Sequence, residues 1–199
     1  MPRTPRYLLG AAAVATALIL GGCAGRMPGA GGVSGAPGRA TASAAFGAAD
    51  VTFAQMMIPH HEQAVDMSDD ILAKDGVDQR IRDLATQIKA AQQPEITQLK
   101  EWLNAWGGAE DAMSGMPGMG DGSDGMMSDG DMMALRNASA AEAGRPFLEG
   151  MIVHHQGAIV MAQTELDHGE NGDARALARA IVTSQGEEIG VMKELLASL

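Results

Sequence analysis

Four of the chain's five histidines occur as two adjacent pairs in nearly identical surroundings. The first stretch reads MIPHHEQAVDM, residues 57–67, and the second reads MIVHHQGAIVM, residues 151–161. Neutral imidazole binds many transition metals, and thioether sulfur prefers soft ions such as Cu(I). The spacing therefore indicates a metal site whose candidate ligands are His60, His61, His154 and His155, with Met67 and Met161 as further candidates and Met57 and Met151 one helical turn before the pairs. For Met67 and Met161, packing in the apolar core is the stronger alternative.

The histidine pairs lie within an internal repeat. Its first halves match at an offset of 94, where Phe53, Met57, Ile58, His60, His61, Ala64 and Met67 correspond to Phe147, Met151, Ile152, His154, His155, Ala158 and Met161. Its second halves match at an offset of 93, where Leu84, Ile88, Gln92, Glu95, Ile96, Lys100 and Glu101 correspond to Leu177, Ile181, Gln185, Glu188, Ile189, Lys193 and Glu194.

Each repeat is predicted to fold as a helical hairpin. Gly with Asp or Asn between the matched halves (KDGVD and HGENGD) indicates a turn, and the apolar residues on either side recur with helical period. Two hairpins can bury their apolar faces against each other, which predicts an all-α, antiparallel four-helix bundle of ferritin-like type. No segment alternates with the period of two that a strand requires.

The bundle must then position the histidines. On a helical wheel both members of each pair fall near the centre of the apolar stripe, and Glu95 and Glu188 lie at the centre of the stripe on the second helices. Residues equidistant from an antiparallel turn lie level, so the histidines and glutamates are expected in one polar layer. Gln92 and Gln185 lie one turn away and are expected to support the ligands by hydrogen bonding.

That layer has two interpretations. A network of Glu–His hydrogen bonds could fix the register of the bundle without any metal. Alternatively, four histidines and two carboxylates could hold an ion, with Glu95 and Glu188 among its ligands. The duplication of the whole set favours metal. Imidazole and carboxylate would also suit zinc or iron.

The stretches FAQMMIPHHEQAVDMS and FLEGMIVHHQGAIVMA, each followed by a helix carrying Gln-x-x-Glu, resemble the secreted bacterial proteins catalogued as domain of unknown function 305. The resemblance covers about residues 50–199, apart from the central linker. It implies a ferritin-like fold and, as in some members, extracytoplasmic copper binding through histidine and methionine. On this resemblance the ligands are Met57, His60, His61, Met151, His154 and His155.

A low-complexity linker is predicted for residues 107–140, between the first hairpin (48–106) and the second (141–199). It contains seven of the chain's 15 methionines, interleaved with Gly and Asp. A disordered linker ordinarily avoids apolar side chains, so we interpret these methionines as an auxiliary loop for Cu(I) or Ag(I): Met113, Met116, Met119, Met126, Met127, Met132 and Met133.

The N-terminus predicts export and a lipid anchor. Arg3 and Arg6 precede an apolar run that ends in LGGC, which resembles a lipoprotein signal peptide over residues 1–22. Cys23 is the only cysteine and would carry the lipid that binds the protein to the membrane. Residues 23–47, rich in Gly, Ala, Pro and Ser, would form a flexible tether.

The net charge narrows the class of partner. The formal charge of −11 becomes −13 once Arg3 and Arg6 are removed, which argues against nucleic acid and favours cationic partners such as metal ions. The sequence therefore predicts an extracytoplasmic, lipid-anchored protein that sequesters or transfers copper. A dinuclear redox enzyme in the same layer is the first alternative, and a metal-free structural or partner-binding bundle is the second.

Overall fold

The computed structural model describes residues 45–108 and 125–199, and every regular element in these ranges is a helix. The helices are α1 (Ala48–Leu72), α2 (Gln79–Trp106), α3 (Asp129–Asn137), α4 (Ala140–His168) and α5 (Gly172–Ala197). The predicted all-α class is confirmed. Pro59 and Pro94 lie within α1 and α2, each on the exposed side of its helix.

Local sequence signals set the helix ends. Asp78, Ser128 and Asn171 accept hydrogen bonds from free N–H groups of the first turns of α2, α3 and α5. Ser139 and Glu142 form a capping box at the start of α4. Gly107 ends α2 in the left-handed conformation, with φ of 71°.

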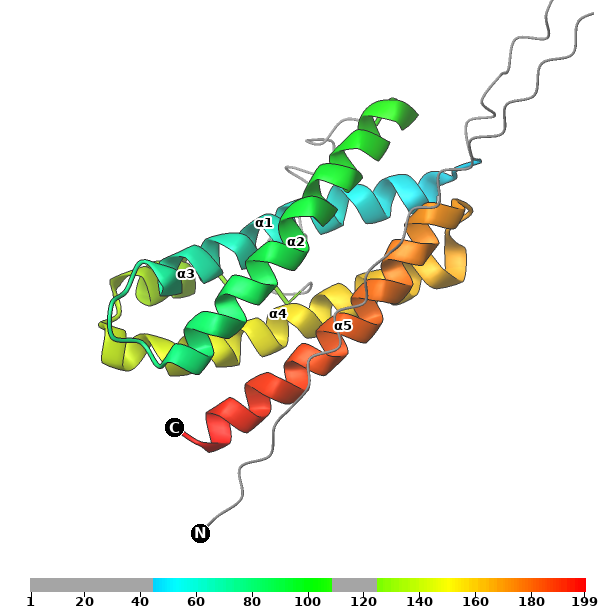
Figure 1. The fold of residues 1–199 in the computed structure, drawn as a ribbon. Coiled ribbons are helices and arrows are strands. Elements are labelled where there is room, and N and C mark those ends of the chain that lie inside the picture. Colours follow the sequence, from blue (N-terminus) through cyan, green and yellow to red (C-terminus); the bar gives the residue numbers. More distant parts are fainter. Residues whose placement is uncertain (1–44, 109–124) are drawn as a thin grey trace, which may run out of the picture. The chain divides into compact units, whose positions relative to one another are not determined.

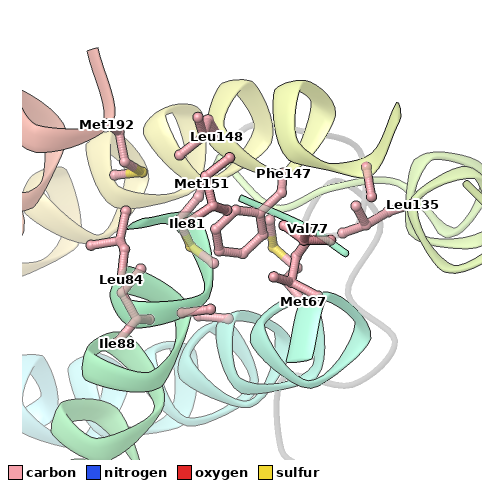
Figure 2. Close-up of a cluster of buried hydrophobic side chains, with 14 of the residues drawn as sticks. Met67, Val77, Ile81, Leu84, Ile88, Leu135, Phe147, Leu148, Met151 and Met192 are labelled. Carbon is pink, nitrogen blue, oxygen red and sulfur yellow. The ribbon is translucent and has the colours of Figure 1, made fainter. Parts of the chain in front are cut away.

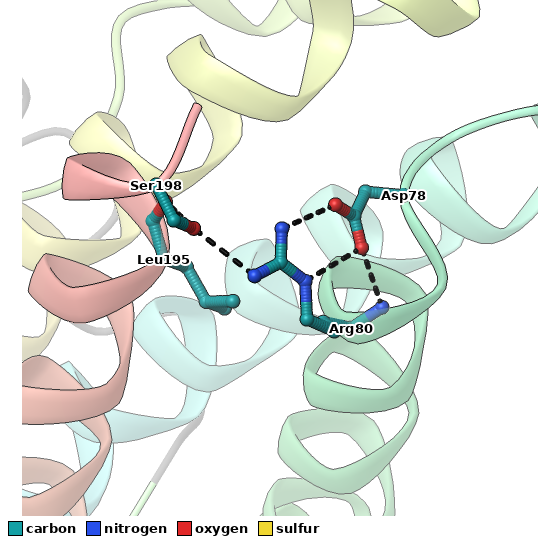
Figure 3. A network of polar contacts seen from close by, with 4 residues as sticks. All are labelled: Asp78, Arg80, Leu195 and Ser198. Atoms are coloured by element: carbon teal, nitrogen blue, oxygen red, sulfur yellow. Dashed lines mark hydrogen bonds and ion pairs between the residues drawn. The ribbon is translucent and has the colours of Figure 1, made fainter. Parts of the chain in front are cut away.

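Helices α1 and α2 are antiparallel to each other, as are α4 and α5, and α1 packs against α4 as well as against α2 (Figure 1). Contacts along the chain fix this register. Lys100 on α2 donates to Glu62 on α1 at 2.8 Å, and the α4–α5 turn reaches the beginning of α1. Arg80, at the start of α2, bonds both Asp78 and Ser198 beyond the end of α5, so these two helices are joined at that end (Figure 3).

The core consists of two apolar clusters. One surrounds Phe147 near the α1–α2 turn and includes Met67, Ile81, Leu135 and Met192 (Figure 2). The other lies toward the opposite end of the bundle and contains Phe53, Met57, Ile96, Leu99, Leu103, Ala158, Met161 and Ile181. Along α1 and α4 the histidine pairs fall between residues of the two clusters.

The structure corrects the predicted linker. Its last part is ordered: residues 129–137 form α3, Leu135 is fully buried, and Met132 belongs to the cluster around Phe147. Ser128 caps this helix, and Asp129 and Asp131 in its first turn suit the positive end of the helix dipole. Two aspartates of the predicted linker, Asp129 and Asp131, therefore belong to the start of a helix.

None of the helices in residues 45–108 and 125–199 is long and apolar enough to cross a membrane.

Candidate metal centre

The histidine layer is formed by His60 and His61 on α1 and by His154 and His155 on α4, all buried. The rings of His60 and His154 touch across the two helices, with centroids 3.7 Å apart and planes inclined by 38°. Each of these rings is 6.4 Å from its neighbour in sequence. Helices α1 and α4 thus bring the two pairs into one layer, and the His60–His154 contact lies at its centre.

A glutamate on the adjacent helix holds each outer histidine. Nε2 of His61 lies 2.8 Å from Oε2 of Glu95, and Nε2 of His155 lies 2.6 Å from Oε2 of Glu188. A carboxylate only accepts, so Nε2 carries the proton and Nδ1 presents its lone pair. Both glutamate side chains are 21% exposed. They therefore orient the histidines from the edge of the core, whereas the sequence placed them at the centre of the stripe.

The environment keeps His154 neutral. Burial lowers the pKa of His154 well below its ordinary value of 6.5, and the neighbouring His60, His155 and His61 lower it further. A proton there would have neither solvent nor a carboxylate to compensate its charge. Because only unprotonated imidazole can bind a metal ion, this ring is held in the form that a ligand requires.

Hydrogen bonding leaves several buried polar atoms of the layer without a partner among the described residues. These are Nδ1 of His61 and of His155, both ring nitrogens of His154, both amide atoms of Gln92, and Oε1 of Gln185. An unsatisfied buried polar group is costly and rare in a native protein. The pure hydrogen-bond network accounts for the Glu–His pairs and leaves these atoms unexplained.

The methionines of the repeats divide into two groups. Met57 and Met151 are fully buried and lie one helical turn before His61 and His155, so their thioethers are the nearest sulfurs along the helices. Met67 lies about 9 Å further along the axis than His61, at a rise of about 1.5 Å per residue, in the cluster around Phe147. Met161 lies similarly in the other cluster. All four methionines belong to the apolar clusters, and only the distance along the helix from the histidines separates the two groups.

Within the parts of the chain that the structure describes, no group of three or more His, Cys, Asp or Glu side chains is disposed to hold one ion. Two of the imidazoles have Nε2 engaged by a glutamate, and the other two face each other. The layer therefore offers nitrogen donors in pairs, and the thioethers of Met57 and Met151 would have to complete a coordination sphere.

The auxiliary methionines separate in the structure. Met126 and Met127 are partly buried just before α3, Met132 is buried, and Met133 is 61% exposed. Met113, Met116 and Met119 lie outside the described residues, as do Cys23 and the predicted signal peptide and most of the tether. Met127 and Met132 both pack in the cluster around Phe147, and the soft-metal loop as a whole stays a prediction.

Sequence reasoning missed a buried carboxyl pair, Asp50 on α1 and Glu165 on α4, at the end of the bundle near the α4–α5 turn. Burial, and then hydrogen bonding and charge from Asp50, raise the pKa of Glu165 to about 8. For Asp50 burial acts in the same direction, yet N–H groups of Gly47, Asn171 and Glu170 bond its carboxylate and lower its pKa. Glu165 is thus the protonated partner. The signal that could have revealed it is a glutamate at helical spacing from Met161 and Ala162.

Two repeated helical hairpins around a buried layer of histidine, with glutamate at its edges, define the class: an all-α bundle with candidate soft-metal donors at mid-height. The chain belongs to the family described as Domain of unknown function (DUF305), whose profile matches residues 50–196. The resemblance seen in the sequence is thereby confirmed.

Solved structures agree with this assignment. A DUF305 fragment from Deinococcus radiodurans is 32% identical, with a TM-score of 0.68 over 77% of this chain and 98% of its own. A DUF305 protein from Streptomyces coelicolor, described as secreted, is 34% identical, with a TM-score of 0.68 over 75% of this chain and 91% of its own.

CopM in its Cu(II)-bound form is also similar, being 32% identical with a TM-score of 0.64 over 75% of this chain and 96% of its own. The same protein has been solved in Cu(I)-bound and Ag-bound forms. No curated protein matches the chain in sequence.

Proposed function

We propose that this protein binds copper outside the cytoplasm and sequesters it or passes it on. The observation that carries the proposal is a buried layer of uncharged donors. Imidazole nitrogens of His61, His154 and His155 have no hydrogen-bond partner among the described residues, and the buried Met57 and Met151 lie about one helical turn away along α1 and α4. Imidazole with thioether suits Cu(I) better than the hard cations, which prefer oxygen. The similarity to CopM, solved with copper and with silver, supports the same metals.

In this proposal the two glutamates position ligands. Glu95 and Glu188 fix the tautomer of His61 and His155, so that each Nδ1 lone pair points away from the carboxylate and is available to an ion. Carboxylate partners of this kind raise the basicity of a metal-bound histidine and hold its ring. The ligands we assign are therefore His60, His61, His154, His155, Met57 and Met151, with copper as the bound ion.

The location outside the cytoplasm rests on the LGGC stretch and on the secreted relative from Streptomyces coelicolor. We propose that Cys23 is lipidated and that residues 24–47 tether the bundle to the membrane. In a bacterial host the parent should take up labelled fatty acid and sediment with membranes. The Cys23→Ser variant should do neither, and a labelled Cys23→Ser protein would contradict the assignment.

Metal titration tests the copper site. The chain, purified without added metal, is titrated with Cu(I) in competition with a chelator of known affinity. We expect tight binding that the double variant His60→Gln/His154→Gln weakens at least tenfold. The matched control is His168→Gln, because His168 is the fifth histidine and is exposed at the end of α4. Equal binding by the double variant and the control would overturn the site.

The dinuclear redox alternative predicts a different outcome. Two metal ions in an oxidase-type centre would require carboxylates that bridge them, whereas Glu95 and Glu188 each bond a histidine from the edge of the core. Metal analysis after expression in rich medium decides between the two. Retention of close to two iron or manganese ions per chain favours the enzyme, and uptake of Cu(I) favours sequestration.

A further inference from the structure

A short segment before α3 lies across the outside of the histidine layer. We call this segment, residues 125–128, the strap. The side-chain amide of Gln63 on α1 makes two hydrogen bonds to the strap. Its Nε2 donates to the carbonyl of Met127 at 2.9 Å, and its Oε1 accepts from the N–H of Met127 at 2.8 Å. One side chain thereby satisfies both backbone groups of a residue 64 positions away.

Glycines let the strap reach α4. Gly125 is buried with φ of 78°, and a Cβ there would lie 2.4 Å from the carbonyl oxygen of Val153 and 3.1 Å from Gly157. A Cβ on Gly150 would lie 2.8 Å from the sulfur of Met127. A larger residue at Gly125 would push the strap off the helix, because it would meet backbone atoms, whereas one at Gly150 would require the Met127 side chain to move.

The residues that contact the strap lie on the same helix faces as the histidines of the proposed metal site. Gly150 and Gly157 lie four residues before and three residues after His154, so all three share one face of α4. Gln63 lies three residues after His60 and shares its face of α1 in the same way. The strap therefore crosses the seam between α1 and α4 at the level where His60 and His154 touch.

The two repeats differ at these very positions. At the offset of 94, Gly150 corresponds to Met56 and Gly157 corresponds to Gln63. The first repeat supplies the Gln63 side chain that bonds the strap, and the second repeat supplies the space at Gly150 and Gly157 that the strap occupies. Two identical repeats would lack either the hydrogen-bonding side chain of Gln63 or the space at Gly150 and Gly157. The repeats also differ elsewhere, for example at Pro59 and Val153, but at these two pairs the difference coincides with contacts to the strap.

We propose that Gln63 is a positioning residue, which seats the strap over the α1–α4 seam and thereby slows the exchange of metal with the histidine layer. The inference rests on the proposed copper site. Because the strap contributes a barrier and no ligand, its release should accelerate uptake and loss alike and leave the affinity nearly unchanged. A role in stability alone would change neither rate at a temperature where the bundle is folded.

The test compares variants of the full chain by stopped-flow transfer of Ag(I) or Cu(I) to and from a chelator. Gln63→Ala removes both hydrogen bonds and should raise both rates about tenfold, equivalent to about 1.4 kcal/mol and within the range expected for two neutral hydrogen bonds. Gln63→Glu keeps the acceptor and loses the donor, so its rates should fall between those of the parent and Gln63→Ala. Gln163→Ala, on the exposed face of α4, should match the parent.

A pair of glycine variants provides a second measurement. Gly125→Ala and Gly107→Ala both place a side chain at positive φ, with φ of 78° and 71°. Only the first meets a neighbour, since nothing lies within 4 Å of the Cβ position at Gly107. Gly125→Ala should therefore accelerate exchange and deprotect the amide of Met127 toward hydrogen exchange, whereas Gly107→Ala should do neither.

The outcomes separate the two proposals. If the parent binds neither Ag(I) nor Cu(I), the copper site and the exchange barrier both fail. If the parent binds metal and Gln63→Ala and Gly125→Ala exchange it at parental rates, the barrier alone is wrong. If affinity falls in step with faster loss while uptake is unchanged, the strap supplies a ligand and the barrier is likewise overturned.

Discussion

Glu95 and Glu188 show how a carboxylate can matter to a metal site without touching the ion. Each accepts from Nε2 of a buried histidine, and the acceptance leaves Nδ1 as the only nitrogen with a lone pair. The sequence identified both glutamates and expected them among the ligands. At 21% exposure they lie at the edge of the core, where their charge remains in contact with solvent.

Removing one of these glutamates should weaken copper binding without unfolding the protein. We expect Glu95→Ala to lower Cu(I) affinity about tenfold, at the lower end of the range for residues that orient a metal ligand. Glu95→Gln should lose less, because the amide oxygen still accepts from His61. Competition titration measures both, with the exposed Glu101→Ala as control. An affinity for Glu95→Ala equal to that of the control would show that His61 needs no fixed tautomer.

Glu165 makes stability depend on pH in the neutral range. Its carboxyl has a pKa of about 8 in the folded protein and about 4.3 in an unfolded chain. Between these values the folded state binds more protons, so the free energy of unfolding decreases as pH rises and levels off above about 8. The contribution is fully present below about pH 4 and is lost through pH 8.

Glu165→Gln should remove this dependence, because a neutral amide can still donate to Asp50. The variant and the parent should unfold at similar temperatures at pH 4.5. As pH rises from 4.5 to 8, the free energy of unfolding of the variant should increase relative to that of the parent by roughly 1 kcal/mol per pH unit. Thermal unfolding followed by circular dichroism at each pH gives the difference, and parallel curves from pH 5 to pH 8 would show that the pair does not share a proton.

At the scale of elements, α3 connects the methionine-containing segment to the core. Leu135 is fully buried in the cluster around Phe147, so Leu135→Ala should reduce the free energy of unfolding by about 3 kcal/mol. Met133→Ala, two residues away at 61% exposure, should change it by less than about 0.5 kcal/mol. Urea denaturation measures both. Equal midpoints for the two variants would mean that α3 is not part of the folded core.

The same elements show where sequence reasoning succeeds and where it stops. The hairpins and the histidine layer were predictable because the same sequence pattern occurs in both repeats and helical periodicity places each histidine on a buried face. Helix α3 was missed because Gly and Asp, which disfavour helix interiors, are frequent in this segment. A helix of nine residues also depends on packing, here of Met132 and Leu135 on other helices. The contact of Asp50 with the α4–α5 turn joins residues more than 100 positions apart, which no local pattern encodes.

The strap lies between these cases. Gln63, Gly150 and Gly157 are visible in the sequence as mismatches between the repeats. Helical periodicity alone could not assign these residues a role, because the strap that they contact lies outside the repeats. Comparing the two repeats identifies the positions that differ, and the structure shows what those positions contact.

For the molecule as a whole, the division of the core by the histidine layer has a consequence for cooperativity. Each apolar cluster draws on all four long helices, and the buried histidines of α1 and α4 lie between the clusters at mid-height. Without metal, either end could open while the other stays closed, as in proteins with separate local unfolding units. An ion bound to α1 and α4 would tie the two ends into one unit. Native-state hydrogen exchange should then find two groups of slow amides of unequal free energy in the metal-free protein, and a single common value once copper is bound.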